Sequence, residues 1–206
     1  FGVGKESSPR WSPDGGQIAF ISTREDDKPA IFLIPSNGGE AKRLSDRRIA
    51  EPSDLEWAPD GQSLTFSAKQ GEEKAAESKE GEEEEEKPYR EVTRLFWKMD
   101  GQGWWDGKWR HIWTLGLDGQ LNQITDGDFD HQAPRYAPDG SKILFIANRT
   151  AAADKVRFNN LWLVDADGGE PQRLTHDQCA IAAAIWSPDG KQIAYVGQEI
   201  ERGPNS

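Results

Sequence analysis

The chain has 206 residues, a formal net charge of −11, three histidines and one cysteine. Its excess of carboxylates argues against a nucleic-acid phosphate backbone as partner, and no apolar run reaches the roughly 18 residues of a membrane-spanning helix. The single Cys179 excludes an internal disulfide and fits a reducing compartment. We therefore expect a cytoplasmic location, with the periplasm as the alternative.

The first predicted elements form one repeat unit. Trp11 is followed by Ser-Pro-Asp-Gly, in which Pro fixes φ, the Asp side chain caps the turn and Gly takes a positive φ, and this is hairpin chemistry. An apolar strand follows at 17–22, then a third strand at 31–34, a Gly-rich turn and a short fourth strand at 42–45. The pattern predicts a four-stranded antiparallel meander over 10–46.

The same phrase returns three times, and every copy has an aromatic residue three positions before its Asp. These aromatic residues are Trp11, Trp57, Tyr136 and Trp186. Meanders whose strands are apolar on both faces bury themselves against one another, as β-propeller blades do, so we expect the aromatic rings to fill the wedges between neighbouring blades. The sequence predicts an all-β fold: one domain over 1–206, a β-propeller fragment of about three and a half four-stranded antiparallel blades in an incomplete ring. The expected blades cover 10–46, 55–126 and 134–176, and the half-blade covers 184–198.

The second unit is longer than the others. From the turn Asp to the aromatic residue of the third strand there are 18 residues in the first unit, 23 in the third and 53 in the second. The excess predicts an insertion at about 69–110, between the second and third strands of that unit. Its segment 70–88 has nine Glu and three Lys and lacks apolar residues to bury, which favours a mobile loop or a frayed helix.

Meander geometry separates the loops into two faces. The Pro-Asp-Gly turns and the Gly-rich turns lie on one face, and the insertion and the connections between blades lie on the other. Functional residues concentrate on loops that a rigid scaffold holds, so we expect the functional surface on the insertion face. The candidate substrate-binding or partner-binding residues there are Arg94, Asp100, Trp104, Trp105 and Arg110. For Trp104 and Trp105 the alternative is packing of the inserted ribbon, which we favour because indole rings carry a large apolar area.

Other candidate sites are weaker. His111, His131 and His176 lack an accompanying nucleophile motif, so structural or surface roles are favoured. The acidic run 126–130 does not keep the Gly and Glu spacing of a calcium-binding EF-hand loop. We expect no catalytic residue, no metal and no cofactor in this chain.

Two family resemblances follow from these residues. The phrase Pro9 to Gly15 and the closing Arg-Leu-Thr at 173–175 resemble the Tol type of propeller repeat. The segment 94–118, with Met-Asp-Gly-Gln-Gly-Trp at 99–104 and His-Ile-Trp at 111–113, resembles the propeller of the prolyl oligopeptidase family of serine peptidases, in its acylaminoacyl peptidase and dipeptidyl aminopeptidase branch.

The second resemblance implies a serine peptidase that cleaves short or N-blocked peptides, with an α/β-hydrolase domain following the propeller. The Gly-x-Ser-x-Gly elbow of that domain does not occur in this chain. The implied role of the propeller is to restrict access to the active site. A Tol-type protein-binding propeller without enzyme activity is the alternative, and a propeller glycosidase or lectin is a third reading. The apolar flanks of the terminal blades leave homo-oligomerisation open.

Overall fold

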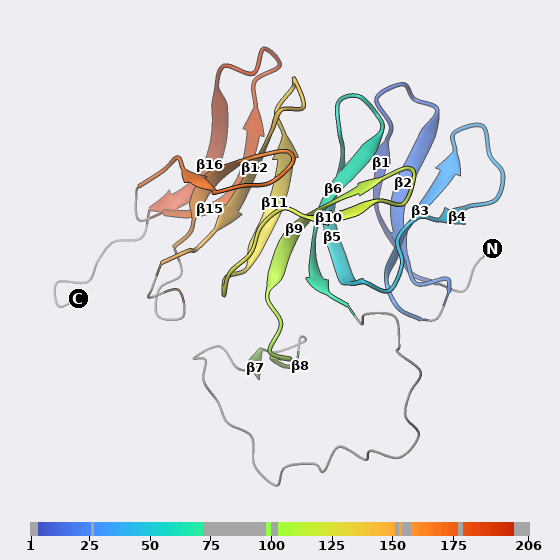
Figure 1. Cartoon of the computed structure of the whole chain (residues 1–206), viewed down its shortest axis with the longest axis horizontal. Coiled ribbons are helices and arrows are strands. Elements are labelled where there is room, and N and C mark those ends of the chain that lie inside the picture. The colour runs from blue at the N-terminus through green and yellow to red at the C-terminus, as the bar shows by residue number, and fades with distance from the viewer. Residues whose placement is uncertain are drawn as a thin grey trace, which may run out of the picture.

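The computed structural model describes residues 4–25, 27–71, 98–99, 103–150, 153, 158–176 and 179–199. In these residues the chain is all-β, with three four-stranded sheets and a two-stranded sheet standing side by side along the long axis of the molecule (Figure 1). This arrangement confirms the predicted fold class. No helix in the described ranges is long and apolar enough to cross a membrane.

The first sheet follows the meander that its sequence predicts. Its strands pair antiparallel in chain order: β1 (Glu6–Trp11), β2 (Gln17–Ser22), β3 (Ala30–Pro35) and β4 (Lys42–Arg43). The turn between β1 and β2 closes when Gly15 N donates to Ser12 O at 2.9 Å, and Gly15 has φ +70°. That φ is in the left-handed region, which is why the repeat phrase ends in Gly.

The second sheet contains the insertion. Its strands are β5 (Ile49–Trp57), β6 (Ser63–Gln70), β9 (Arg110–Gly116) and β10 (Leu121–Gln123). β6 pairs directly with β9, from Ser63 opposite Gly116 to Lys69 opposite Arg110. Between them, β7 (Lys98–Met99) and β8 (Gly103–Trp104) form a small separate hairpin. Most of the acidic segment at 70–88 lies outside the described residues.

The third sheet repeats the pattern, and half a sheet follows it. The strands are β11 (His131–Tyr136), β12 (Lys142–Ala147), β13 (Asn160–Asp165) and β14 (Gln172–Arg173), followed by the antiparallel pair β15 (Cys179–Trp186) and β16 (Ile193–Glu199). The first strand of each sheet contacts the first strand of the next, β1 with β5, β5 with β11, and β11 with β15. These are therefore the innermost strands of the blades.

The apolar cores lie between sheets. Trp57 of β5 packs in one cluster with Ile31 of the first sheet and Phe66 of its own sheet. Its indole Nε1 donates to Arg10 O of β1 at 3.0 Å. In the same way Tyr136 of β11 packs with residues of the second sheet. The repeated aromatic residue thus joins each sheet to the one before it.

Trp11 departs from this rule and corrects the prediction. Its side chain was expected to fill a wedge between blades, but the residue is 62% exposed. The reason is positional: the aromatic residue packs on the preceding sheet, and no described residue forms a sheet on that side of β1. A buried environment for this position requires a neighbour that local sequence cannot supply.

The innermost strands share a backbone irregularity. Ser8, Asp54 and Ala133 each lie three residues before the aromatic residue of their strand, and their φ angles are +54°, +56° and +52°. The strand register shifts at each of these positions. A β-bulge bends its strand and redirects side chains, so the bulges lie at equivalent points of the innermost strands.

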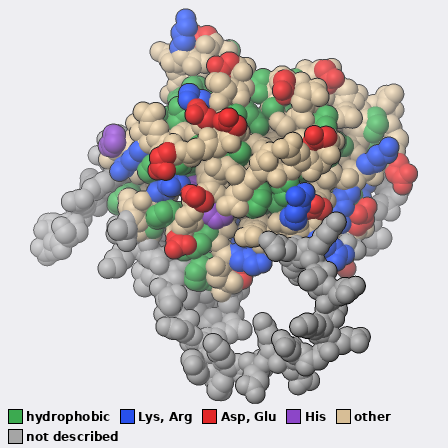
Figure 2. All heavy atoms as spheres, viewed as in Figure 1, with side chains coloured by type: hydrophobic (Ala, Val, Ile, Leu, Met, Phe, Trp, Pro, Cys, Tyr) green, Lys and Arg blue, Asp and Glu red, His purple; other side chains and the backbone are tan. Residues whose placement is uncertain are grey.

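The two expected faces are visible in the structure. The Pro-Asp-Gly turns lie at the upper edge of Figure 1, and β7 and β8 lie at the opposite edge. We call these edges the turn face and the insertion face. Figure 2 shows acidic and basic side chains interspersed over the side of the molecule that joins them.

Candidate functional site

The structure places the predicted site residues unequally. Arg94 and Asp100 lie outside the described residues, and Trp104 ends β8 without a described side chain. Trp105 and Arg110 are described. Substrate contact by any of the five residues remains a prediction, but the surroundings of the last two can be stated.

Arg110 of β9 forms hydrogen bonds and an ion pair with residues of β5 in the second sheet. Its Nη1 donates to Glu51 O at 2.6 Å and to Ser53 Oγ at 3.2 Å, and its Nη2 lies 3.2 Å from Glu51 Oε2. These contacts tie β9 to the innermost strand β5 across β6. The guanidinium is therefore used within the sheet, which is a structural role.

Trp105 packs against the returning arm of the insertion. Its ring centroid lies 5.2 Å from that of Trp109, and its Nε1 donates to Lys108 O at 3.2 Å. Asp106 accepts from Lys69 Nζ at 3.1 Å and so ties this arm to β6. For Trp105 these contacts favour the packing alternative over an open aromatic platform.

His131 occupies a buried bridging position on the insertion face. It is 0% exposed, its Nδ1 lies 3.2 Å from Arg110 O, and its Nε2 lies 2.9 Å from Arg149 Nη1. Because a carbonyl only accepts and a guanidinium only donates, Nδ1 carries the proton and Nε2 accepts. Burial lowers the pKa of His131 to about 4, so the ring is neutral near neutral pH. Both nitrogens are engaged, which leaves no free lone pair for general-base chemistry.

His111 and Arg149 complete this cluster. The His111 ring centroid lies 5.4 Å from that of His131, and burial lowers the pKa of His111 as well. The Arg149 guanidinium stacks over the rings of Phe129 and Trp162 at 5.5 and 5.4 Å. Among the described residues, neither His111 nor His131 is hydrogen-bonded to a serine or cysteine side chain, and no group of three or more acidic, His or Cys residues could hold a metal ion.

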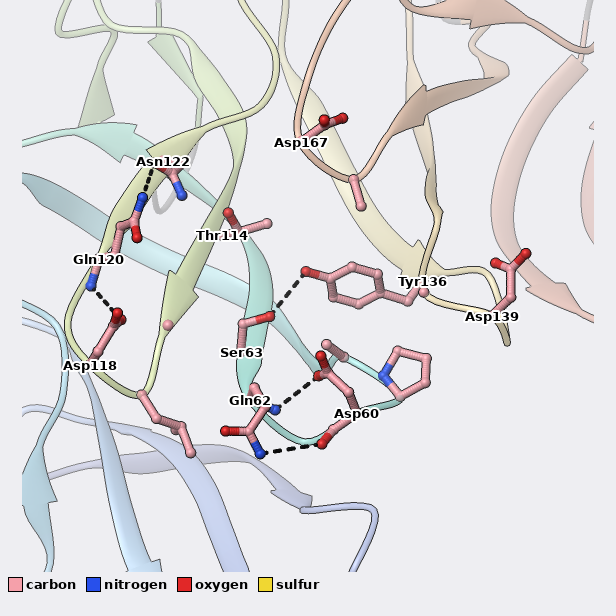
Figure 3. Close-up of a pocket in the computed structure, with 16 residues that line it drawn as sticks. Asp60, Gln62, Ser63, Thr114, Asp118, Gln120, Asn122, Tyr136, Asp139 and Asp167 are labelled. Atoms are coloured by element: carbon pink, nitrogen blue, oxygen red, sulfur yellow. Dashed lines mark hydrogen bonds between the residues drawn. The ribbon is translucent and has the colours of Figure 1, made fainter.

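A cleft of about 610 Å³ lies on the turn face, between the second and third sheets (Figure 3). Four carboxylates from four different turns line it: Asp60, Asp118, Asp139 and Asp167. Tyr136 crosses the cleft toward Ser63, with 3.4 Å between the two hydroxyl oxygens. Reasoning from sequence expected little chemistry on this face and missed the cleft.

A sequence signal for the cleft was present. The turn phrase begins with Ser12 and Ser187 in the outer units but with Ala58 and Ala137 in the two units that flank the cleft. Ser12 Oγ and Ser187 Oγ each donate to the Asp of their own turn at 2.6 Å. An alanine cannot make this bond. Asp139 accepts from Ser141 Oγ instead, at 2.7 Å, so among these four turn carboxylates only Asp60 has no hydroxyl donor from a described residue.

The fold and these sites together define a β-propeller domain without a recognisable catalytic centre in its described residues. Residues 76–206 match the family described as the acylaminoacyl-peptidase N-terminal beta-propeller domain. The chain belongs to this family, which confirms the resemblance seen in 94–118.

Relatives of known sequence agree with this assignment. The chain is 32% identical to the uncharacterized peptidase YuxL of Bacillus subtilis over 79% of its own length and 25% of YuxL. It is 30% identical to the uncharacterized protein Atu1656 of Agrobacterium fabrum, over 90% of this chain and 67% of that protein. The chain thus spans about a quarter of the peptidase it resembles.

Solved structures show the same fold. The acylaminoacyl peptidase of Pyrococcus horikoshii superposes with a TM-score of 0.65 at 20% identity, covering 96% of this chain and 29% of that one. TolB of Acinetobacter baumannii superposes with a TM-score of 0.60 at 24% identity, covering 98% of this chain and 39% of that one. The Tol-type character of the repeat therefore has a structural counterpart.

Proposed function

We propose that this chain is the non-catalytic, access-controlling propeller portion of a serine peptidase that cleaves short or N-blocked peptides. Membership of the acylaminoacyl-peptidase propeller family carries the proposal. In it, the bond-breaking residues belong to an α/β-hydrolase domain that follows the propeller. The absence of a Gly-x-Ser-x-Gly elbow from the 206 residues supports this division.

The described residues suit a scaffold. His131 is the most deeply buried histidine. Burial lowers its pKa and keeps it neutral, and its ring nitrogens bond Arg110 O and Arg149 Nη1 instead of a nucleophile. Cores shared between neighbouring sheets hold the described strands of the blades together. We place the hydrolase domain and the passing peptide on the insertion face, with Arg94, Asp100 and Trp104 as contacts. We further propose that the protein is cytoplasmic.

A fluorophosphonate probe and two substrates test this function. The probe should label the natural protein that contains this chain on a serine outside the 206 residues, and should leave the isolated chain unlabelled. The natural protein should cleave an N-acetylated dipeptide p-nitroanilide with a kcat/KM at least tenfold above that for a 30-residue peptide ending in the same residues. Labelling within this chain, or equal kcat/KM for both substrates, would overturn the proposal.

A protein-binding propeller of Tol type is the second candidate. It is supported by the TolB superposition and by 31% identity to the TolB of Albidiferax ferrireducens over 46% of this chain. This function requires no reactive serine. A natural protein that takes up no fluorophosphonate, but that retains a second protein through one face of the propeller, would favour it.

A further inference from the structure

We propose that Asn37 is a site of spontaneous deamidation, at which the backbone nitrogen of Gly38 attacks the side-chain amide and converts the residue to aspartate or isoaspartate. The two residues form the only Asn-Gly pair in the 206-residue sequence, and asparagine is among the residues that degrade spontaneously in proteins. They lie in the turn between β3 and β4. Ser36 N of this turn donates to Gly16 O of the first Pro-Asp-Gly turn at 2.9 Å, so the site lies on the turn face, away from the access role proposed above.

The surroundings of the pair leave room for the reaction. Asn37 and Gly38 are both exposed, and among the described residues none forms a hydrogen bond with the Asn37 amide. Gly38 has φ +94°, and a Cβ placed on it would meet no atom within 4 Å. Because Gly38 carries no side chain, its nitrogen can approach Cγ of Asn37 without a steric clash.

One hydrogen bond opposes the reaction, and it is the longest among three equivalent turns. Gly38 N donates to Pro35 O at 3.1 Å, whereas the corresponding bonds of the second and third sheets measure 2.9 Å. The attacking nitrogen must give up this bond. Gly39 also has a positive φ, +126°, and two adjacent glycines in an exposed turn change conformation at low cost. We therefore expect the turn to open locally while β3 and β4 stay paired.

The reaction needs water and a base, and no oxidant or second protein. The base removes the proton of the Gly38 amide, the nitrogen forms a bond to Cγ of Asn37, and the Cγ–Nδ2 bond breaks. The leaving nitrogen takes up a proton and departs as ammonia. Water then opens the cyclic succinimide. Attack at Cγ gives aspartate with the normal main chain, and attack at the backbone carbonyl carbon gives isoaspartate.

The other sheets indicate that the aspartate product fits the turn. Asp118 and Asp167 occupy the position of Asn37 in the second and third sheets. Asp118 Oδ1 accepts from the backbone N–H of Gln120 at 3.0 Å, and an aspartate at position 37 can accept from Gly39 N in the same way. The isoaspartate product adds one carbon to the main chain and disturbs the hydrogen bond that closes the turn. Both products add a negative charge to the turn face, but only aspartate keeps the shape of the turn.

The test incubates the natural protein that contains this chain at pH 8, in water enriched in oxygen-18. Trypsin at pH 6 then releases the peptide 25–42, in which Asn37 is the only asparagine. Mass spectrometry should show this peptide exchanging its amide nitrogen for one labelled oxygen and separating into two forms, aspartate and isoaspartate. The label excludes conversion during digestion. The peptide 158–173, with Asn159 and the buried Asn160, is the internal control and should convert at least tenfold more slowly, since neither asparagine precedes a glycine.

Two variants sharpen the result. Asn37→Gln should abolish the conversion, because the longer side chain closes the corresponding ring far more slowly. Asn37→Asp supplies the aspartate product directly and should unfold at the same temperature as the unaltered protein, and a lower temperature would contradict the fit of that product.

The unaltered protein alone decides whether the site exists. If peptide 25–42 stayed unmodified in the folded protein while the same peptide converted free in solution, the turn would protect Asn37 and the proposal would fail. Equal conversion of the two tryptic peptides would also overturn it.

Discussion

The junction between the second and third sheets has two ends that differ in how their polar groups are paired. On the insertion face, His131 has both ring nitrogens bonded, to Arg110 O and to Arg149. On the turn face, the Asp60 carboxylate accepts the Gln62 N–H at 2.9 Å, forms no ion pair with another described residue, and lines a cleft of about 610 Å³. The same strands thus make a closed structural joint at one end and an open cleft at the other. Pairing, more than the presence of charged residues, separates scaffold from candidate site.

The largest expected effect on stability comes from replacing His131, the paired histidine on the insertion face. His131→Phe keeps a ring of similar size but leaves Arg110 O and the Arg149 guanidinium without their partner. We expect the free energy of unfolding to fall by about 2–4 kcal/mol, since buried polar groups then remain unpaired. Urea denaturation measures this loss. The exposed His176, changed to Gln, is the control and should alter stability by less than about 0.5 kcal/mol; a loss as small for His131→Phe would contradict the bridging role.

Acidification should also lower the stability of the fold through His131. The pKa of His131 is about 4 in the folded chain, against about 6.5 in an unfolded one. Between these values the unfolded state binds a proton that the folded state does not, so stability falls as the pH falls through this window. The unfolding equilibrium constant should rise by up to about tenfold per pH unit from this group.

Denaturation at pH 7, 6 and 5 measures the slope. In His131→Phe the slope should be smaller, and this difference isolates His131 from the other titrating groups. Equal slopes in both proteins would show that His131 is not the source.

An exchange of Ser and Ala between turns sharpens the comparison. Ser12→Ala removes the 2.6 Å bond to Asp14 and the bond from Gln17 N at 2.9 Å, and should cost about 1 kcal/mol. The reverse change, Ala58→Ser, offers Asp60 the missing donor. It should raise stability by up to about 1 kcal/mol. Thermal unfolding of both variants measures these changes in stability. A stabilising effect of Ser12→Ala would show that the Ser12 hydroxyl does not support its turn.

The smallest effect is expected at the open end. Asp167→Asn and Asp60→Asn remove charge from an acidic cleft and keep an amide oxygen in the position of the acceptor. The free energy of unfolding should change by less than about 0.5 kcal/mol in either variant. A loss of 2 kcal/mol or more would mean that these carboxylates support the fold.

The fold could be predicted because its signals are local. A Pro-Asp-Gly turn between two apolar strands predicts a hairpin from a few adjacent residues. The repetition of this unit predicts that the sheets stack on one another. Trp11 was predicted wrongly because its burial depends on a neighbouring sheet. The identity of Arg110 could not show that its guanidinium is used by Glu51 and Ser53, because these partners are more than fifty residues away in the chain.

The cleft was only partly accessible from sequence. The change from Ser to Ala in the two middle turns was visible, but treating the four turns as copies concealed it. Thr114 and Tyr136 come together because β9 pairs with β6 across the insertion and β11 packs against both strands. No local pattern brings those two side chains to one place.

The sharing of apolar cores between sheets has a consequence for dissecting the protein. A cut between Arg43 and Ile49 would keep all four strands of the first sheet in one fragment. It would, however, remove the packing of Trp57 and Phe66 against Ile31. Each fragment would then expose its half of the apolar core to solvent and would tend to aggregate. The cluster joins β2 and β3 to all four strands of the second sheet. The smallest unit that can be exchanged with its core intact is therefore a pair of neighbouring sheets and not one visible blade.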